Sequence, residues 1–83
     1  MSTPYRTDLP SVVAKVVTEF IGRRVERDEA LVSSGLIDSL SVLRLIGQLE
    51  KALNLKIPTD NLQPDDFDSV DIIVETILRA VLF

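Results

Sequence analysis

Hydrophobic residues recur at helical spacing in the first part of the chain and predict a helix over about residues 9–25, with a frayed end marked by Gly22 and the Arg23/Arg24 pair. Asp8 is a plausible N-cap for this helix, and Pro10 lies in the first turn, where a missing N–H does no harm. We expect residues 1–8 to form a flexible tail. The apolar positions of the predicted face are Leu9, Val12, Val13, Val16, Val17, Phe20 and Ile21.

A second amphipathic pattern covers residues 39–55, with Asp38 or Ser39 as its N-cap. Gly47, inside this pattern, costs about 1 kcal/mol relative to Ala. It marks the close approach of another surface, or it is simply tolerated. The predicted core stripe consists of Leu43, Ile46, Leu49 and Leu53, flanked by Leu40, Val42 and Leu45.

The last helical pattern follows Asp68 and Ser69, which are suitable caps, and places Asp71 in its first turn. A short helical turn is predicted before it over residues 63–67. No segment alternates with period two, so residues 1–83 are predicted to form a single all-α domain, a four-helix bundle of three long helices and one short helix. The apolar set of the last helix is Val70, Ile73, Val74, Ile77, Leu78 and Val81.

The connection over residues 26–38 has 13 residues, which is long for a small bundle. It contains Leu31, Val32, Leu36 and Ile37. These apolar side chains predict a connection that packs against the core, and not a free tether.

Composition restricts the chemistry, because the 83 residues include no Cys and no His. This absence excludes disulfides, a thiolate zinc site, a thiol nucleophile and the commonest general base. The acidic residues after Asp60 lack the turn glycine that a calcium loop requires, because no glycine follows Gly47. We therefore expect no metal site and no catalytic residue.

The net charge of −4 comes entirely from residues 38–83, which carry eight acidic and four basic side chains. This balance argues against nucleic acid and favours a partner with a basic patch. The first ten residues lack an apolar run, and the apolar C-terminal stretch is short and interrupted by charges. We expect a soluble, cytoplasmic monomer without membrane insertion.

The run 34–40, Ser-Gly-Leu-Ile-Asp-Ser-Leu, places Ser39 directly after an acid at the start of the second helix. One interpretation is a simple helix cap. The other is a modified serine, because a helix N-terminus favours a phosphoester. No His can activate Ser39, so another enzyme would have to modify it.

This run resembles the attachment motif of acyl carrier and peptidyl carrier proteins, and the resemblance extends over nearly the whole chain. The Leu-Lys-Ile-Pro exit at 55–58 supports it, and the run 64–70 is similar to stand-alone D-alanyl and other aminoacyl carriers. The resemblance implies a non-enzymatic carrier with 4′-phosphopantetheine attached to Ser39 and Asp38 in a supporting role. It also implies partner docking through the following helix, with Leu40 and Arg44 on its outer side and Val42 either joining them or packing inward.

The implied partners are a phosphopantetheinyl transferase, an adenylating or acyl-transferring loading enzyme, and downstream biosynthetic enzymes. The helix after Ser39 departs from fatty-acid synthase carriers, because Glu50 is its only acid. This favours a specialised pathway and a partner adapted to a mixed-charge docking helix, and it leaves the cargo open among fatty acyl, polyketide and aminoacyl groups. The alternative is a helical protein-interaction adaptor without a prosthetic group, in which Ser39 is only a cap.

Overall fold

The computed structural model describes residues 4–82 and the side chains of residues 8–81. Within these residues all regular structure is helical, as predicted. The elements are α1 (Pro4–Ile21), α2 (Ser39–Leu53), η1 (Pro64–Phe67) and α3 (Val70–Leu82). The expected short fourth helix is a single 3₁₀ turn, η1, so the described residues form three α-helices and not four.

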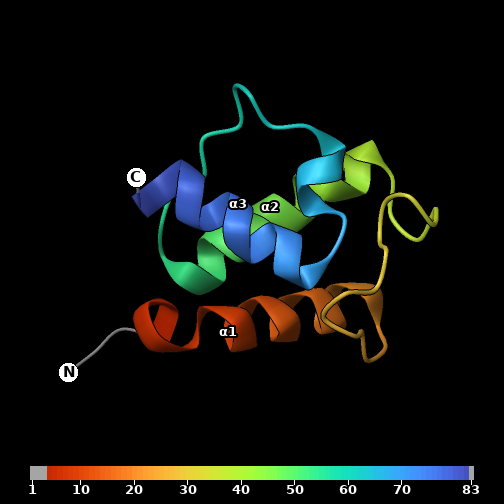
Figure 1. Cartoon of the computed structure of the whole chain (residues 1–83), viewed down its shortest axis with the longest axis horizontal. Coiled ribbons are helices and arrows are strands. Elements are labelled where there is room, and N and C mark those ends of the chain that lie inside the picture. Colours follow the sequence, from red (N-terminus) through yellow and green to blue (C-terminus); the bar gives the residue numbers. More distant parts are fainter. Residues whose placement is uncertain (1–3, 83) are drawn as a thin grey trace.

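The three α-helices pack around one core, with α1 in contact with both α2 and α3 (Figure 1). The turn η1 lies beside the N-terminal end of α2 and places the fully buried Phe67 in that core. Thr76, also buried, donates a hydrogen bond of 2.8 Å from its hydroxyl to the carbonyl of Asp66, and this bond ties α3 to η1. Other fully buried side chains are Leu31, Leu45, Leu49, Ile73, Ile77, Val13, Val17 and Val70.

The first helix differs from the prediction at both ends. Its first residues, 4–7, are helical although we expected a flexible tail there, and residues 1–3 lie outside the described part. Asp8 interrupts α1 with non-helical angles (φ −122°, ψ 28°), so the main helix follows it as predicted. The helix ends at Ile21, not at residue 25, because Gly22 adopts a φ of +90° that only glycine reaches easily.

The second helix is two residues shorter than predicted, because Asn54 adopts the left-handed conformation and caps it. Its buried face also differs in phase from the predicted stripe. Leu43, expected in the core, is 59% exposed, whereas Leu45 is fully buried. No atom lies within 4 Å of a Cβ built on Gly47, so this glycine marks no close approach. The buried residues of α2 are Val42, Leu45, Ile46, Leu49 and Leu53.

The connection between α1 and α2 packs against the core, as its apolar residues predicted. Leu31 is fully buried and Ile37 is 5% exposed. The N–H of Ile37 donates to the carbonyl of Leu31 over 2.9 Å, which closes the connection into a compact loop just before α2. Among residues 4–82, no helix is long and apolar enough to cross a membrane.

Candidate functional site

Ser39 is the first residue of α2, and its side chain is exposed. The preceding residue, Asp38, is extended (φ −105°, ψ −177°) and accepts a hydrogen bond of 2.8 Å from the N–H of Ser41. Asp38 is therefore the N-cap, and Ser39 is not needed for that role. Within the described residues the Ser39 hydroxyl has no hydrogen-bond partner, so it is available to an external reagent.

The electrostatics of this helix end are those of an N-terminus with one capping carboxylate. The N–H of Ser41, and other groups of the first turn, lower the pKa of Asp38, so this carboxylate is ionised at neutral pH. The partial positive charge of the first turn favours an anion, such as a phosphoester, on a side chain at this end. The chain contains no His, so it holds no base of that kind to activate Ser39.

Asp68 holds the loop that leads to Ser39. Its Oδ1 accepts hydrogen bonds from the N–H groups of Leu31 (3.1 Å), Val32 (2.7 Å) and Ser33 (2.8 Å). Its carbonyl also accepts from the N–H of Leu31 over 2.7 Å. These bonds, of which the one from Ser33 has the largest effect, lower the pKa of Asp68. The loop is thus fixed to the start of α3, and through Leu31 and Ile37 this restrains the entry into α2.

The role of Asp68 was missed in the sequence, where it was expected to cap the last helix. The cap is Ser69 alone, whose hydroxyl accepts a hydrogen bond of 3.1 Å from the N–H of Ile72. Ser69 is 5% exposed. A signal did exist: when two capping residues precede one helix, only one is needed, and the other is free for a tertiary contact.

A groove of about 380 Å³ opens beside Ser39, between the first turns of α2 and the segment that leads to η1. Its walls are mostly apolar, and Ser39 stands at its edge as one of the lining residues. The remaining lining residues are Val42, Leu43, Ile46, Thr59, Leu62, Gln63, Pro64 and Phe67.

Two of the three residues expected to form a docking surface are accessible. Leu40 is 71% exposed and Arg44 is exposed, but Val42 is only 4% exposed and packs into the core. Of the two possibilities for Val42, the structure shows inward packing and not a place on the docking surface, because Val42 lies on the buried face of α2. Leu43 faces solvent instead, and Leu36, in the preceding loop, is 40% exposed.

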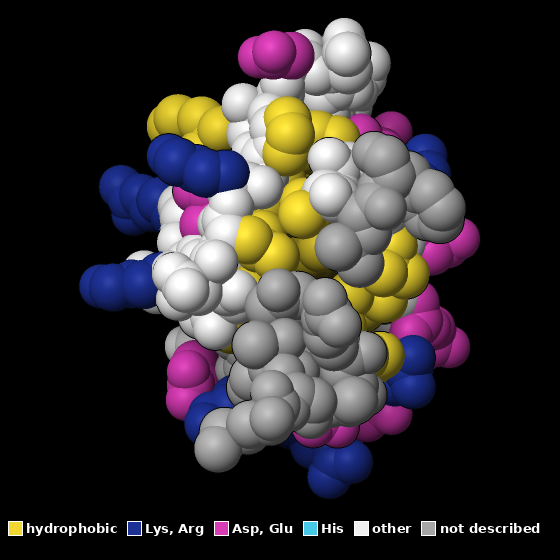
Figure 2. All heavy atoms as spheres, turned by 90° about the vertical axis from the view of Figure 1, so that its left-hand side faces the viewer, with side chains coloured by type: hydrophobic (Ala, Val, Ile, Leu, Met, Phe, Trp, Pro, Cys, Tyr) yellow, Lys and Arg dark blue, Asp and Glu magenta, His cyan; other side chains and the backbone are white. Residues whose placement is uncertain are grey.

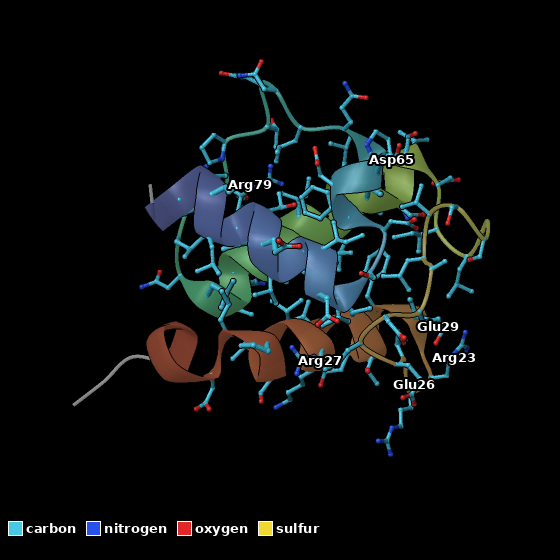
Figure 3. The ribbon with its side chains drawn as sticks, in the orientation of Figure 1. Arg23, Glu26, Arg27, Glu29, Asp65 and Arg79 are labelled. Carbon is cyan, nitrogen blue, oxygen red and sulfur yellow. The ribbon has the colours of Figure 1, made fainter. Side chains whose placement is uncertain are left out.

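The charged clusters elsewhere have local partners. At the end of α1 in Figure 3, Arg23 pairs with Glu29, whose carboxylate also accepts a hydrogen bond from the N–H of Glu26. Arg27 pairs with Asp71 over 2.9 Å and connects the loop to α3. In the described part of the chain, no group of three or more acidic side chains is arranged to hold a metal ion.

Comparison with known proteins places this site in a family. Residues 11–77 match the family described as phosphopantetheine attachment site, and this match includes Ser39 and its loop. The D-alanyl carrier proteins of Streptococcus pyogenes serotype M5 and of serotype M1 are each 40% identical over 48 residues. The matched segment spans 58% of this chain and 61% of the length of each of these relatives.

Proposed function

Because the chain belongs to the phosphopantetheine attachment site family, we propose that it is a carrier protein with 4′-phosphopantetheine attached to Ser39. The observation that supports this site is the exposed Ser39 hydroxyl, left without a hydrogen-bond partner in the described residues because Asp38 takes the cap. When attached, the group supplies a terminal thiol that holds acyl or aminoacyl cargo as a thioester. The protein is then a substrate of other enzymes and has no catalytic residue of its own.

The residues around Ser39 fit such a group. The hydroxyl stands clear of the backbone at a helix end, where the dipole stabilises the negative charge of a phosphodiester. Asp38 keeps the first turn of α2 in place. The hydrogen bonds from residues 31–33 to the Asp68 carboxylate keep the preceding loop in place. The adjoining groove of about 380 Å³ leaves space next to the attachment point.

The attachment reaction needs a transferase. In it, the Ser39 oxygen forms a bond to the phosphorus that carries pantetheine in coenzyme A. The bond to the adenosine bisphosphate leaving group breaks, and a base of the transferase accepts the hydroxyl proton. The part of this chain is to present the hydroxyl on a rigid helix end.

The other partners we propose are a loading enzyme, which adenylates a free acid or transfers an acyl group, and downstream biosynthetic enzymes. Because the relatives are named D-alanyl carrier proteins, an amino acid is the first cargo to test. We propose a cytoplasmic monomer of the carrier type, with η1 in the place of the short fourth helix.

Intact-mass measurement tests this function directly. The protein is incubated with coenzyme A, magnesium and a promiscuous phosphopantetheinyl transferase, beside a known carrier as positive control. We expect the wild-type protein to gain one phosphopantetheine and Ser39→Ala to gain none, with an unchanged circular dichroism spectrum. Ser69→Ala is the matched control, because it removes the serine of the other Asp-Ser pair, and it should still be modified.

Two results would contradict the proposal. If Ser39→Ala still gains mass, the attachment site is wrong. If the wild-type protein gains none while the positive control is fully modified, the adaptor without a prosthetic group becomes the better description. Supplying D-alanine, ATP and a D-alanine-activating enzyme to the modified protein then tests the cargo by a second mass increase.

A further inference from the structure

The solvent face of α2 forms one continuous stripe that begins next to Ser39. Exposed residues follow one another at intervals of three and one along the helix, which places them on a single face. We call this face the α2 stripe; it consists of Leu40, Leu43, Arg44, Gly47, Gln48 and Lys51.

The apolar part of the α2 stripe lies at the Ser39 end. Leu40 is 71% exposed and Leu43 is 59% exposed. With Leu36, at 40%, they are the exposed large hydrophobic residues of the described part of the chain. All three lie within four positions of Ser39 in the sequence. A cluster of exposed leucines at one end of a small protein is typical of a surface that another protein covers.

The charged part of the α2 stripe is entirely basic. Neither Arg44 nor Lys51 forms an ion pair with any described residue. The single acid of α2, Glu50, lies off the stripe and accepts a hydrogen bond of 2.8 Å from the N–H of Ile57. Its carboxylate is thus engaged within the protein and forms no ion pair with either cation of the stripe.

Five acidic residues lie outside α2, on η1, on α3 and between them. In Figure 1, α3 crosses in front of α2, so the α2 side appears on the left in Figure 2 and the α3 side on the right. Lys and Arg side chains project on the left in that view, and Asp and Glu side chains lie along the right-hand edge with Lys and Arg side chains among them. The acids of η1, α3 and the residue between them are Asp65, Asp66, Asp68, Asp71 and Glu75.

From this arrangement we propose that the α2 stripe docks a partner enzyme whose surface has an apolar centre rimmed by carboxylates. Leu40 and Leu43 fill the apolar centre beside Ser39, and Arg44 and Lys51 meet the carboxylates. The inference rests on the proposed carrier function and adds the chemistry of its partner. It also differs from the expectation drawn from the net charge of −4, because the charged side chains of the docking face, Arg44 and Lys51, are basic.

Two synthetic helical peptides test the charge of the partner. They share one leucine face, flanked by glutamates in one peptide and by lysines in the other. Binding to the full-length, unmodified protein is measured by fluorescence anisotropy, and the contact surface is mapped from amide NMR shifts. We expect the glutamate peptide to bind about tenfold more tightly, less so at high salt, with shifts concentrated on the α2 stripe.

Two double variants with the same change in net charge, from −4 to −8, separate local from overall charge. Arg44→Glu with Lys51→Glu should reverse the preference between the peptides. Lys15→Glu with Arg24→Glu changes exposed cations off the stripe and should keep it. Attraction by net charge alone favours the lysine peptide, so this preference in the wild-type protein overturns the proposal. Equal binding, no binding of either peptide, or shifts away from α2 also overturns it.

The peptide test does not depend on phosphopantetheine. If the protein prefers the glutamate peptide but is not modified at Ser39, the carrier proposal fails and the docking proposal stands. If the protein is modified at Ser39 but prefers the lysine peptide, the carrier proposal stands and the docking proposal fails.

Discussion

The chain uses the same Asp-Ser pair at the start of two helices, and the two pairs divide their work in opposite ways. At α2, Asp38 caps the helix through the N–H of Ser41, and Ser39 is exposed. At α3, Ser69 caps the helix through the N–H of Ile72 and is buried. There the aspartate, Asp68, turns away from its own helix and holds a distant loop.

The difference shows what makes one serine available and the other not. A helix start offers one main capping position, and the side chain that takes it is no longer free. Because Asp38 takes the position at α2, the Ser39 hydroxyl remains free. Because Asp68 is engaged with residues 31–33, Ser69 has to cap α3 and becomes inaccessible. The residue after each pair follows the same division, since Leu40 is 71% exposed and Val70 is fully buried.

The largest effect on stability should come from removing the aspartate that holds the loop. We expect Asp68→Ala to lower the free energy of unfolding by about 2–3 kcal/mol, because the half-buried N–H of Val32 loses its acceptor. The N–H of Leu31 keeps the main-chain carbonyl of residue 68, which limits the loss. Urea unfolding measures the change. A loss of unfolding free energy below about 0.5 kcal/mol is in the range of an ordinary surface substitution. It would show that the loop does not need the hydrogen bonds to the Asp68 carboxylate.

Acid should weaken the same hydrogen bonds, those that the Asp68 carboxylate accepts from the loop. The folded-state pKa of Asp68 is lower than the ordinary value of 3.8, so its contribution to stability is complete above that value. The contribution is lost as the pH falls through the depressed folded pKa. We expect Asp68→Asn to flatten the fall in the urea midpoint below about pH 4. Some dependence should remain, because the pKa values of Asp38 and Glu29 are also lowered.

If the urea midpoint of Asp68→Asn falls with pH in the same way as that of the wild-type protein, Asp68 is excluded as the source of the acid sensitivity. Asp38→Asn is the comparison variant for this measurement. It should flatten the profile less than Asp68→Asn, since Asp38 accepts one backbone hydrogen bond at 2.8 Å where Asp68 accepts three.

A smaller loss is expected when the second serine is removed. Ser69→Ala deletes the cap of α3 and should cost about 1 kcal/mol in the free energy of unfolding. Thermal or urea unfolding measures it. If this variant is as stable as the wild-type protein, the hydroxyl of Ser69 is not the functional cap.

The smallest effect is expected at the first serine. Ser39→Ala should change the free energy of unfolding by less than about 0.5 kcal/mol, because the side chain is exposed and caps nothing. The two serine variants should thus have opposite effects. Ser39→Ala keeps its stability and loses phosphopantetheine attachment, whereas Ser69→Ala loses stability and keeps attachment. A clear loss of stability in Ser39→Ala would mean that Ser39 shares the capping role with Asp38.

Several features followed from local patterns. The three amphipathic stretches predicted the helices, since their apolar spacing requires one buried face each. Apolar residues in the long connection predicted its packing, and Leu31 and Ile37 are buried. The C-terminal ends of α1 and α2 were predicted too late in the sequence. Each end is set by a single residue with a positive φ, Gly22 after α1 and Asn54 after α2.

The phase of α2 was harder to predict. Leucine, valine and isoleucine cover most of its circumference, so more than one face is apolar enough to be the core. The arrangement of α1 and of η1 decides that Val42 and Leu45 are buried and Leu43 is not. The same ambiguity left Val42 open between the docking surface and the core. A local pattern cannot choose between two apolar faces when the choice depends on what packs against them.

The amino-acid sequence by itself determined the helical class, the position of Ser39 at a helix start and its membership in the attachment-site family, because these depend on short-range spacing and on a local motif. Only the tertiary structure decided which Asp-Ser pair leaves its serine free and which leucines of α2 face solvent. The physical reason is that each of these depends on a contact between distant segments, such as Asp68 with the loop at 31–33, which local spacing does not encode.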